Sequence, residues 1–499
     1  MIADLPLITV TLPGRTVSET RAEAELARLG GADLAEIRLD RWTMADRARA
    51  HELFPTPLPL VATLRSRAEG GEGPDAPEER GANLEALARL PFRWIDLEET
   101  RDGPTIDRLD RHGAPGRILS THLPEGTSPA DVVRCVNGPS APGSIRKVVI
   151  PASVGTLLKE ILPVLEAARA TPTVVLTTGP SGALLRAWSR RFRFPLVYAS
   201  LPETKGIGAR LRVEASQLPG NRLRRFFSGN LDAPLFAVIG HPVDHSRSPY
   251  LHSRWMDSAG IPGLYVSLDI ASESEFVESL GPLADGRFVG LNVTHPWKTA
   301  ALEAATRVSP GARLCGAANC LSLRHDEVEA ENTDLVAILR RLDEYRRAGI
   351  WNGKELVVVG AGGAAAATLA AARGLNVPAY VVARNLERAE ALARRLGATH
   401  LMAADVRPFS LVVHATSVGR DGAGPLDVPL AQLLGPRTQV LDWVYSAKDS
   451  AIQEAIEHVG GRYEDGWRLL VYQAAASFAI WWGSEPAPEE LKATISEGP

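Results

Sequence analysis

Lysine is scarce in this chain, and one lysine stands where its chemistry could matter. Seven of the 55 lysines and arginines are lysines, so arginine is the default cation. Lys147 lies in the run IRKVVIPAS, whose β-branched residues are typical of a buried parallel strand. Burial disfavours the charged amine, and a neutral amine can attack a ketone to form a Schiff base. The alternative is a strand-end lysine whose ammonium reaches solvent.

Other polar residues follow neighbouring apolar runs. His122 ends the preceding run, ILSTHL, and could be the base beside an iminium. Glu36 and Arg38 are two residues apart, so on a strand they point the same way, and Arg65 precedes Glu69 in a TLRSRAEGG turn. Inward arginines indicate a carboxylate or phosphate ligand. A structural ion pair for each arginine and a structural histidine are the alternatives.

The elements that would position these residues repeat eight times. Short apolar runs alternate with helix-like segments from residue 7 to about 201: LITVTL, AEIRLD, LPLVATLR, FRWIDLEE, RILSTHL, IRKVVIPAS, TPTVVLTTG and PLVYASL. Eight strand–helix repeats predict a compact (β/α)8 barrel, whose chemistry lies at the C-terminal ends of its strands. The polar residues above fall at those ends, together with Arg186 and Ser200.

A glycine-rich turn follows a strand-like run in the second half. In ELVVVGAGGAAAA, Gly360, Ala361 and Gly362 stand between an apolar run and helix-forming alanines, as in a dinucleotide-binding fingerprint. Arg384 ends the next strand, YVVAR, where an NAD site needs an acidic residue, and Arg388 follows one helical turn later. This pair suits a 2′-phosphate and favours NADP over NAD. Solvated arginines are the alternative.

A second lysine is paired with an acid in the sequence pattern. Lys298 ends GLNVTHPWK and Asp334 ends AENTD, both amid small and polar neighbours. A lysine fixed by a carboxylate could give the proton that a reductase needs. His241 and His245 are four apart, but Pro242 argues against a helical metal site and no third ligand has matching spacing. We therefore predict no metal.

Residues 1 to about 215 resemble type I 3-dehydroquinate dehydratase in their E-x-R, R-x-x-x-E and S-x-H motifs, the strand lysine and the LLRAW segment. The resemblance implies that Lys147 forms a Schiff base with the substrate ketone. His122 would move the proton, with Glu69 as a further catalytic residue, and Arg186 would hold the substrate carboxylate. The remaining implied substrate contacts are Glu36, Arg38, Arg65, Ser200 and Thr204. Leu123 replaces an aspartate of the family, and Thr204 a glutamine.

Residues from about 233 to 490 resemble shikimate dehydrogenase in GHPVDHSRSPYLH, GLNVTHPWK, GAANCL, NTD, GAGGAA, ATSVG, LDWVY and DGWRLLVYQAA. The resemblance implies a catalytic pair, Lys298 and Asp334. Implied shikimate contacts are Ser246, Ser248, Thr294, Asn319, Asp334, Tyr445 and Gln473. Implied cofactor contacts are Gly360, Ala361, Gly362, Gly363, Ala364, Arg384, Asn385, Arg388, Thr416, Trp443 and Arg468. Departures from the family are Ala383 and Asn385 within N-R-T, His414 for asparagine, Trp443 for methionine and Arg468 for glycine.

Length and composition limit the organisation. The 499 residues predict about three domains. We expect an α/β chain: a (β/α)8 barrel at 1–217, a linker at 218–232, a shikimate-binding α/β domain at 233–335, a Rossmann NADP-binding domain at 336–464, and C-terminal helices at 465–499 that return to the substrate domain. A net charge of -4 offers no field for nucleic acid or anionic lipid.

The cysteines and the N-terminal residues indicate the compartment. Three cysteines are an odd, sparse set, which favours free thiols in a reducing environment. The start MIADLPLITVTL has no basic n-region and is expected to be a strand rather than a signal peptide. We expect a cytoplasmic protein without a transmembrane segment.

Both resemblances point to consecutive reactions. They imply dehydration of 3-dehydroquinate to 3-dehydroshikimate and NADPH-dependent reduction of that product to shikimate, with these small molecules as the partners. A catabolic quinate/shikimate dehydrogenase fusion is one alternative. A non-catalytic quinate-sensing homologue is another, although both candidate lysines are present. The sequence leaves the oligomeric state open.

Overall fold

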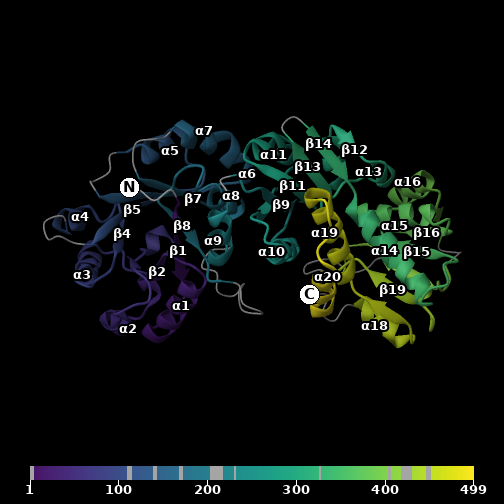
Figure 1. Cartoon of the computed structure of the whole chain (residues 1–499), viewed down its shortest axis with the longest axis horizontal. Coiled ribbons are helices and arrows are strands. Elements are labelled where there is room, and N and C mark those ends of the chain that lie inside the picture. Colours follow the sequence, from purple (N-terminus) through teal and green to yellow (C-terminus); the bar gives the residue numbers. More distant parts are fainter. Residues whose placement is uncertain are drawn as a thin grey trace. The chain divides into compact units, whose positions relative to one another are not determined.

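The computed structural model describes residues 5–109, 115–138, 143–167, 172–202, 217–229, 232–324, 327–402, 406–416, 418, 430–445 and 451–498. The chain divides into two compact units (Figure 1). One contains Met1–Leu235 and Pro262–Ile270, and the other contains Phe236–Ile261 and Ala271–Pro499. None of the described helices is long and apolar enough to cross a membrane.

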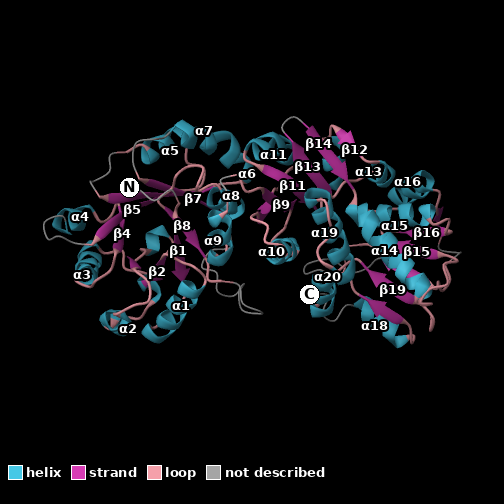
Figure 2. Ribbon diagram, in the orientation of Figure 1, coloured by secondary structure: helices cyan, strands magenta, loops and turns pink. Residues whose placement is uncertain are grey.

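Eight parallel strands form the sheet of the first unit (Figure 2). They are β1 (Leu7–Leu12), β2 (Leu34–Arg38), β3 (Leu60–Thr63), β4 (Trp94–Glu98), β5 (Gly116–His122), β6 (Ser144–Pro151), β7 (Thr173–Thr178) and β8 (Leu196–Ala199). The order follows the chain from β7 back to β1, and β8 pairs with β1, so the sheet curls into a nearly closed barrel. Each predicted strand is present, and the predicted (β/α)8 class is confirmed.

The two faces of the barrel strands differ in chemistry. The Thr11 and Thr63 hydroxyls both donate to the Glu36 carboxylate, which places these residues of three neighbouring strands on one face. The alternate residue Val10 faces outward against Gly220 of a helix. Because side chains alternate along a strand, the polar groups gather inside the barrel and the apolar ones meet the helices.

Helices follow the barrel strands. They are α1 (Val17–Leu29), α2 (Met44–Ala48), α3 (Pro77–Ala88), α4 (Gly103–Leu109), α5 (Pro129–Val136), α6 (Val154–Thr156), α7 (Leu162–Ala167), α8 (Gly182–Ala187) and α9 (Gly220–Ser228). Helix α9 lies within the segment 218–232, where a linker is predicted from the sequence. Its Leu223, Phe226 and Phe227 are buried, and Ser200 after β8 forms a bridge with Pro219. The apolar face of α9 therefore makes this stretch part of the first unit rather than a free connection.

The second sheet is mixed. Its order is β10 (Leu264–Asp269), β9 (Leu235–Gly240), β11 (Phe288–Val293), β13 (Cys320–Arg324), β14 (Glu327–Glu331) and β12 (Arg307–Val308). Strand β13 runs antiparallel to β11 and β14. The helices of this region are α10 (Ser248–Ser258), α11 (Glu273–Asp285), α12 (Lys298–Glu303) and α13 (Pro310–Cys315).

The third sheet is a doubly wound parallel sheet. Its order is β17 (Thr399–His400), β16 (Ala379–Val382), β15 (Leu356–Val359), β18 (Leu411–His414), β19 (Gln439–Asp442) and β20 (Arg462–Glu464). The order reverses between β15 and β18, where such sheets bind ligands beyond the strand C-termini. The accompanying helices are α14 (Thr333–Arg347), α15 (Gly363–Gly374), α16 (Leu386–Leu396), α17 (Leu430–Leu433), α18 (Ala451–His458), α19 (Trp467–Trp482) and α20 (Pro488–Glu497).

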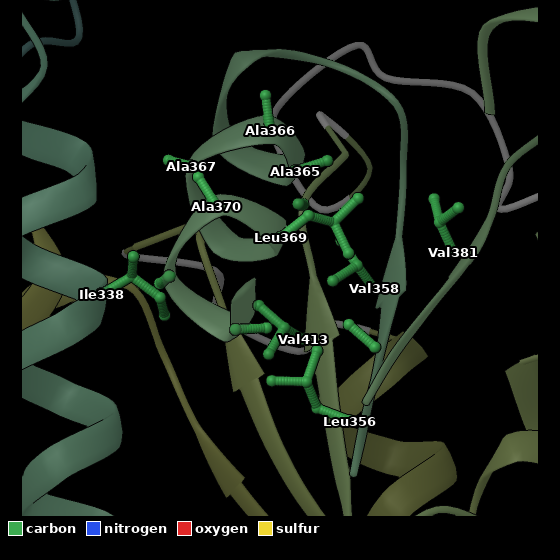
Figure 3. Packing of buried hydrophobic residues seen from close by; sticks show 14 of the residues in the cluster. Ile338, Leu356, Val358, Ala365, Ala366, Ala367, Leu369, Ala370, Val381 and Val413 are labelled. Carbon is green, nitrogen blue, oxygen red and sulfur yellow. The ribbon is translucent and has the colours of Figure 1, made fainter. Parts of the chain in front are cut away.

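Helix α15 packs directly on the third sheet (Figure 3). Ala365 and Leu369 of the helix share one buried cluster with Val358 of β15 and Val413 of β18. The small alanine side chains let the helix lie close to the strands, which fixes its N-terminus beside the switch point. The predicted Rossmann class is confirmed.

Candidate active sites

The buried lysine of the barrel is paired with carboxylates. Lys147 is 5% exposed. Its Nζ donates to Asp96 Oδ2 at 2.9 Å and lies 3.6 Å from Glu36 Oε1. The ammonium also lies 4.3 Å from the ring centroid of Tyr198. The sequence predicted an uncompensated, desolvated amine, but the structure surrounds Lys147 with negative charge, which offsets the cost of its burial.

Arg65 connects the acids around this lysine. Its Nη1 donates to Glu69 Oε2 at 2.8 Å and to Ser120 Oγ at 3.0 Å, and its Nη2 donates to Asp96 Oδ1 at 2.9 Å. Burial alone would raise the pKa of Asp96, but the charges of Arg65 and Lys147 and the Ser120 hydrogen bond hold it well below its usual range. Asp96 is therefore a permanent carboxylate between two cations.

His122 and Glu69 form a hydrogen-bonded pair at the C-terminal end of the barrel. The distance from His122 Nδ1 to Glu69 Oε2 is 2.8 Å. Burial lowers the pKa of His122 and outweighs the Glu69 hydrogen bond, and the charges of Arg65 and Lys147 lower it further. The carboxylate acceptor fixes the proton on Nδ1, so neutral His122 has Nε2 as its basic atom. The pair can therefore accept and return a proton.

The other predicted barrel residues take different positions. Arg38 makes two 2.8 Å hydrogen bonds to Asp40. Arg186 is buried and donates to the carbonyls of Tyr198 at 3.0 Å and Gly182 at 2.7 Å. These contacts engage both guanidinium groups with the protein itself. Ser200 is buried beside α9, and Thr204 lies outside the described residues.

Three residues of this site were missed from the sequence. Asp96 alternates with Glu98 in WIDLE, the same period-two pattern that identified Glu36 and Arg38, so a strand-by-strand search would have found it. Tyr198 lies within the apolar run PLVYASL, where no neighbouring polar residue marks it as part of a site. Gln217 donates from Nε2 to Thr11 Oγ1 at 3.2 Å inside the barrel, and its position depends on how the chain returns after β8.

The second unit brings a lysine and an aspartate together. Lys298 starts α12 and Asp334 lies in the first turn of α14, with 2.5 Å between Nζ and Oδ2. Asn319 Nδ2 donates to Asp334 Oδ1 at 2.9 Å and lies 3.4 Å from Gln473 Oε1. The Asn332 side chain caps α14 by accepting from the Leu335 N–H. The structure thus brings Lys298, Asp334, Asn319 and Gln473 together.

The glycine turn lies beside this lysine. A Cβ on Gly363 would be 3.3 Å from Cδ of Lys298, so a side chain there would crowd the lysine. Helix α15 begins at Gly363 and its N-cap, Gly362, provides no capping side chain, so the first backbone N–H groups can bind a phosphate. Gly360 has φ 127° and leaves no room for a Cβ, which would meet Ala415 O at 2.6 Å. These features fit a pyridine dinucleotide.

The remaining predicted shikimate contacts lie near strand ends of the second sheet or after β19. Ser246 accepts from the Ser248 N–H at 3.3 Å, and Ser248 is buried. The Thr294 N–H donates to Ile239 O at 2.9 Å, which joins the ends of β11 and β9. Tyr445 follows β19 and is half-buried.

The predicted cofactor residues divide into two groups. Arg384 and Arg388 are exposed after β16, and Asn385 caps α16 by accepting from the Arg388 N–H at 2.9 Å. Trp443 Nε1 donates to Thr368 on α15 at 3.2 Å. By contrast, the guanidinium of Arg468 lies 3.8 Å from Glu344 and 3.7 Å from Glu464, which ties it to α14 and β20. Among the described residues, no group of three or more metal-ligating side chains could hold a metal ion.

Comparisons with known proteins agree with both halves. Family models match at residues 8–225, "Type I 3-dehydroquinase", and at 238–321, "Shikimate dehydrogenase substrate binding domain". Shikimate dehydrogenase (NADP(+)) of Paracoccus denitrificans is 38% identical over 266 residues, which cover 52% of this chain and 94% of the relative. The enzyme of Acidiphilium cryptum is 37% identical over 265 residues, with 52% and 94% covered.

Two solved structures are also similar. Shikimate 5-dehydrogenase from Thermus thermophilus, in complex with NADP(H) and shikimate, is 30% identical, covers 53% of this chain and 99% of its own, and has a TM-score of 0.47. Dehydroquinate dehydratase and shikimate dehydrogenase from S. pombe is 22% identical, with 99% and 98% covered and a TM-score of 0.42.

Fold and sites define a two-part α/β enzyme with a lysine-containing barrel and a dinucleotide-binding half. The chain belongs to the type I 3-dehydroquinase family in its first part and to the shikimate dehydrogenase family in its second. The fusion predicted from the two sequence resemblances is confirmed.

The pKa of His122 can be measured directly. In an NMR titration we expect its ring protons, assigned with the His122→Gln variant, to titrate below the ordinary value of 6.5 because burial opposes protonation. Glu69→Gln should lower the midpoint further, since the negative partner that favours imidazolium is gone. A midpoint above 6.5, or an upward shift in Glu69→Gln, would contradict this assignment.

Proposed function

We propose that this chain dehydrates 3-dehydroquinate to 3-dehydroshikimate and reduces that product to shikimate with NADPH. The observation that carries the proposal is the pair of lysine sites on one chain. Lys147 lies in a barrel with the His122–Glu69 pair, and Lys298 lies between Asp334 and a glycine turn. Retention of both lysines speaks against a sensing homologue, and two arginines after β16 speak against an NAD-linked catabolic enzyme.

The dehydration uses the carboxylates around Lys147. Lys147 passes a proton to neutral His122, and its Nζ attacks the substrate ketone. His122 returns that proton to the departing hydroxyl, so water leaves and an iminium forms. Asp96 and Glu36, which face the ammonium at 2.9 and 3.6 Å, stabilise this cation equally well. His122 Nε2 takes a proton from the substrate carbon next to the iminium carbon. It then returns this proton to the substrate hydroxyl that leaves, so a second water departs. Hydrolysis then frees Lys147 and consumes one water, for a net loss of one.

The reduction uses the lysine–aspartate pair. NADPH, when bound at the glycine turn, supplies a hydride. Lys298 gives a proton to the carbonyl oxygen, and Asp334 keeps the ammonium in place. Asn319 and Gln473 present buried amides next to Asp334, which suits the hydroxyl groups of a polyol substrate.

Further assignments follow from the same evidence. We propose domain boundaries after residues 232, 335 and 464, with α9 extending the barrel beyond residue 217. We also propose a cytoplasmic location, supported by three free cysteines, of which Cys315 and Cys320 are buried.

The Schiff base can be trapped. Borohydride reduction with 3-dehydroquinate should attach the ligand to Lys147, and Lys147→Ala should abolish both labelling and dehydration. Lys159→Ala, on the exposed side of the barrel, is the matched control and should behave as wild type. Labelling of another lysine, or normal dehydration by Lys147→Ala, would refute the mechanism.

The two active sites should be chemically independent, because each unit contains its own acid, base and lysine. Lys298→Ala should lower the reduction rate about 10²- to 10⁴-fold, the usual contribution of a positioned acid, while 3-dehydroshikimate accumulates. Lys147→Ala should still reduce added 3-dehydroshikimate normally. If either variant, folded by circular dichroism, lost both reactions, independence would be wrong.

Arg384 and Arg388 should select the 2′-phosphate of NADPH. Charge-assisted hydrogen bonds contribute about 1.5–3 kcal/mol each, so replacing both by Ala should raise the KM for NADPH at least tenfold and leave that for NADH nearly unchanged. Arg394→Ala, also exposed on α16, is the control. An equal loss with both cofactors would assign these arginines to the fold instead.

A further inference from the structure

A buried histidine bridges an aspartate and a threonine at the end of β18. His414 is fully buried, and its register partner on β19 is Asp442. His414 Nδ1 lies 2.7 Å from Asp442 Oδ1, and Nε2 lies 2.6 Å from Thr416 Oγ1. The imidazole thus connects Asp442 to Thr416 through one hydrogen bond on each side of the ring.

The groups around this histidine determine which ring nitrogen carries a proton. Asp442 as a carboxylate already accepts from the Val444 N–H at 2.8 Å and from the Tyr463 hydroxyl at 2.9 Å. It can only accept from the ring, so Nδ1 carries a proton, and the tautomer with one ring proton accepts at Nε2. The Thr416 hydroxyl therefore donates to His414, while its oxygen accepts from the Val418 N–H at 3.1 Å. Both the rotamer and the hydroxyl direction of Thr416 are fixed.

Thr416 stands opposite the glycine turn. The sheet order reverses between β15 and β18, so the residues after these two strands flank the crevice in which a dinucleotide binds. A Cβ on Gly360 would lie 2.6 Å from Ala415 O and 3.3 Å from Thr416 Cγ2. The residues after His414 are thus in direct contact with the first glycine of the turn.

We propose that His414 and Asp442 are positioning residues for the pyridine dinucleotide and act through Thr416. They hold Ala415 and Thr416 at the spacing from Gly360 that the cofactor requires. The proposal rests on the proposed function, because it takes NADPH as the ligand. It assigns a role to a histidine that stands where related sequences have an asparagine.

The test is a double-mutant cycle read by NADPH fluorescence titration of the full chain. His414→Phe keeps a ring without hydrogen bonds, and Thr416→Val keeps the shape without the hydroxyl. Each should weaken NADPH binding about three- to tenfold, and the double variant should be no weaker than the weaker single variant. The KM for shikimate and the dehydration rate of the same chain should stay unchanged. Tyr463→Phe, which removes the other side-chain contact of Asp442, is the control and should bind NADPH normally.

Each result decides between a positioning and a structural role. If His414→Phe lowers the melting temperature but leaves NADPH affinity intact, the histidine only supports the fold and the proposal is wrong. Additive losses in the double variant would refute action through Thr416. If His414→Phe does not fold, Thr416→Val and His414→Asn still decide, and normal affinity in both refutes the proposal. A wild-type chain that binds no NADPH would instead overturn the proposed cofactor.

Discussion

Buried positive charge needs a fixed negative partner, and the barrel is built around that constraint. Lys147 and Arg65 are each 5% exposed, and an unpaired ion at such a depth costs several kcal/mol. Asp96 lies between them, Glu36 faces the lysine, and Ser120 bonds to both Asp96 and Arg65. These groups come from β2, β4, β5 and β6 and from the turn after β3, which are neighbours in the sheet, so the curvature of the sheet brings them together. In the proposed dehydration, these side chains would need little rearrangement, because the ammonium of Lys147 and an iminium at the same position carry the same charge.

The second unit meets the same requirement with helix ends instead of strands. Asp334 lies in the first turn of α14, where a carboxylate is stabilised by the helix dipole. Its two oxygens are divided between Lys298 and Asn319. The lysine in turn borders the glycine turn through Gly363. Packing of the alanine-rich α15 on β15 and β18 fixes the position of that turn (Figure 3). Lys298 and the glycine turn, the proposed proton donor and cofactor site, are thus adjacent, and a close-packed hydrophobic cluster fixes the position of the turn.

Sequence periodicity predicted the elements well, and contacts between elements poorly. All eight barrel strands follow from short apolar runs that alternate with helical segments, and the glycine turn follows from its position between strand and helix. The alternation in WIDLE marks Asp96 as a candidate inward residue, but its contact with Lys147 depends on register. Lys147 pairs with Ser120, Ser120 pairs with Glu98, and Asp96 lies two residues before Glu98 on β4. That Arg186 binds a ligand stays a prediction, but the sequence did not indicate that its guanidinium donates to the carbonyls of Thr177, Gly182 and Tyr198. Helix α9 was hidden by the Pro, Gly and Arg residues around its short apolar face.

The chain contains two similar histidine–carboxylate pairs, His122–Glu69 and His414–Asp442, that differ in solvent exposure. In both, Nδ1 faces a carboxylate at 2.8 or 2.7 Å, which fixes the tautomer and makes Nε2 basic. The His122 side chain is 24% exposed, so its Nε2 can meet a ligand and exchange a proton. The His414 side chain is 0% exposed, and its Nε2 already faces the Thr416 hydroxyl. A base that no substrate can reach cannot transfer the substrate's proton, but it can hold a neighbour in one orientation. The exposed pair in the barrel therefore suits the acid–base role proposed for it, and the buried pair in the second unit suits the positioning role proposed for His414.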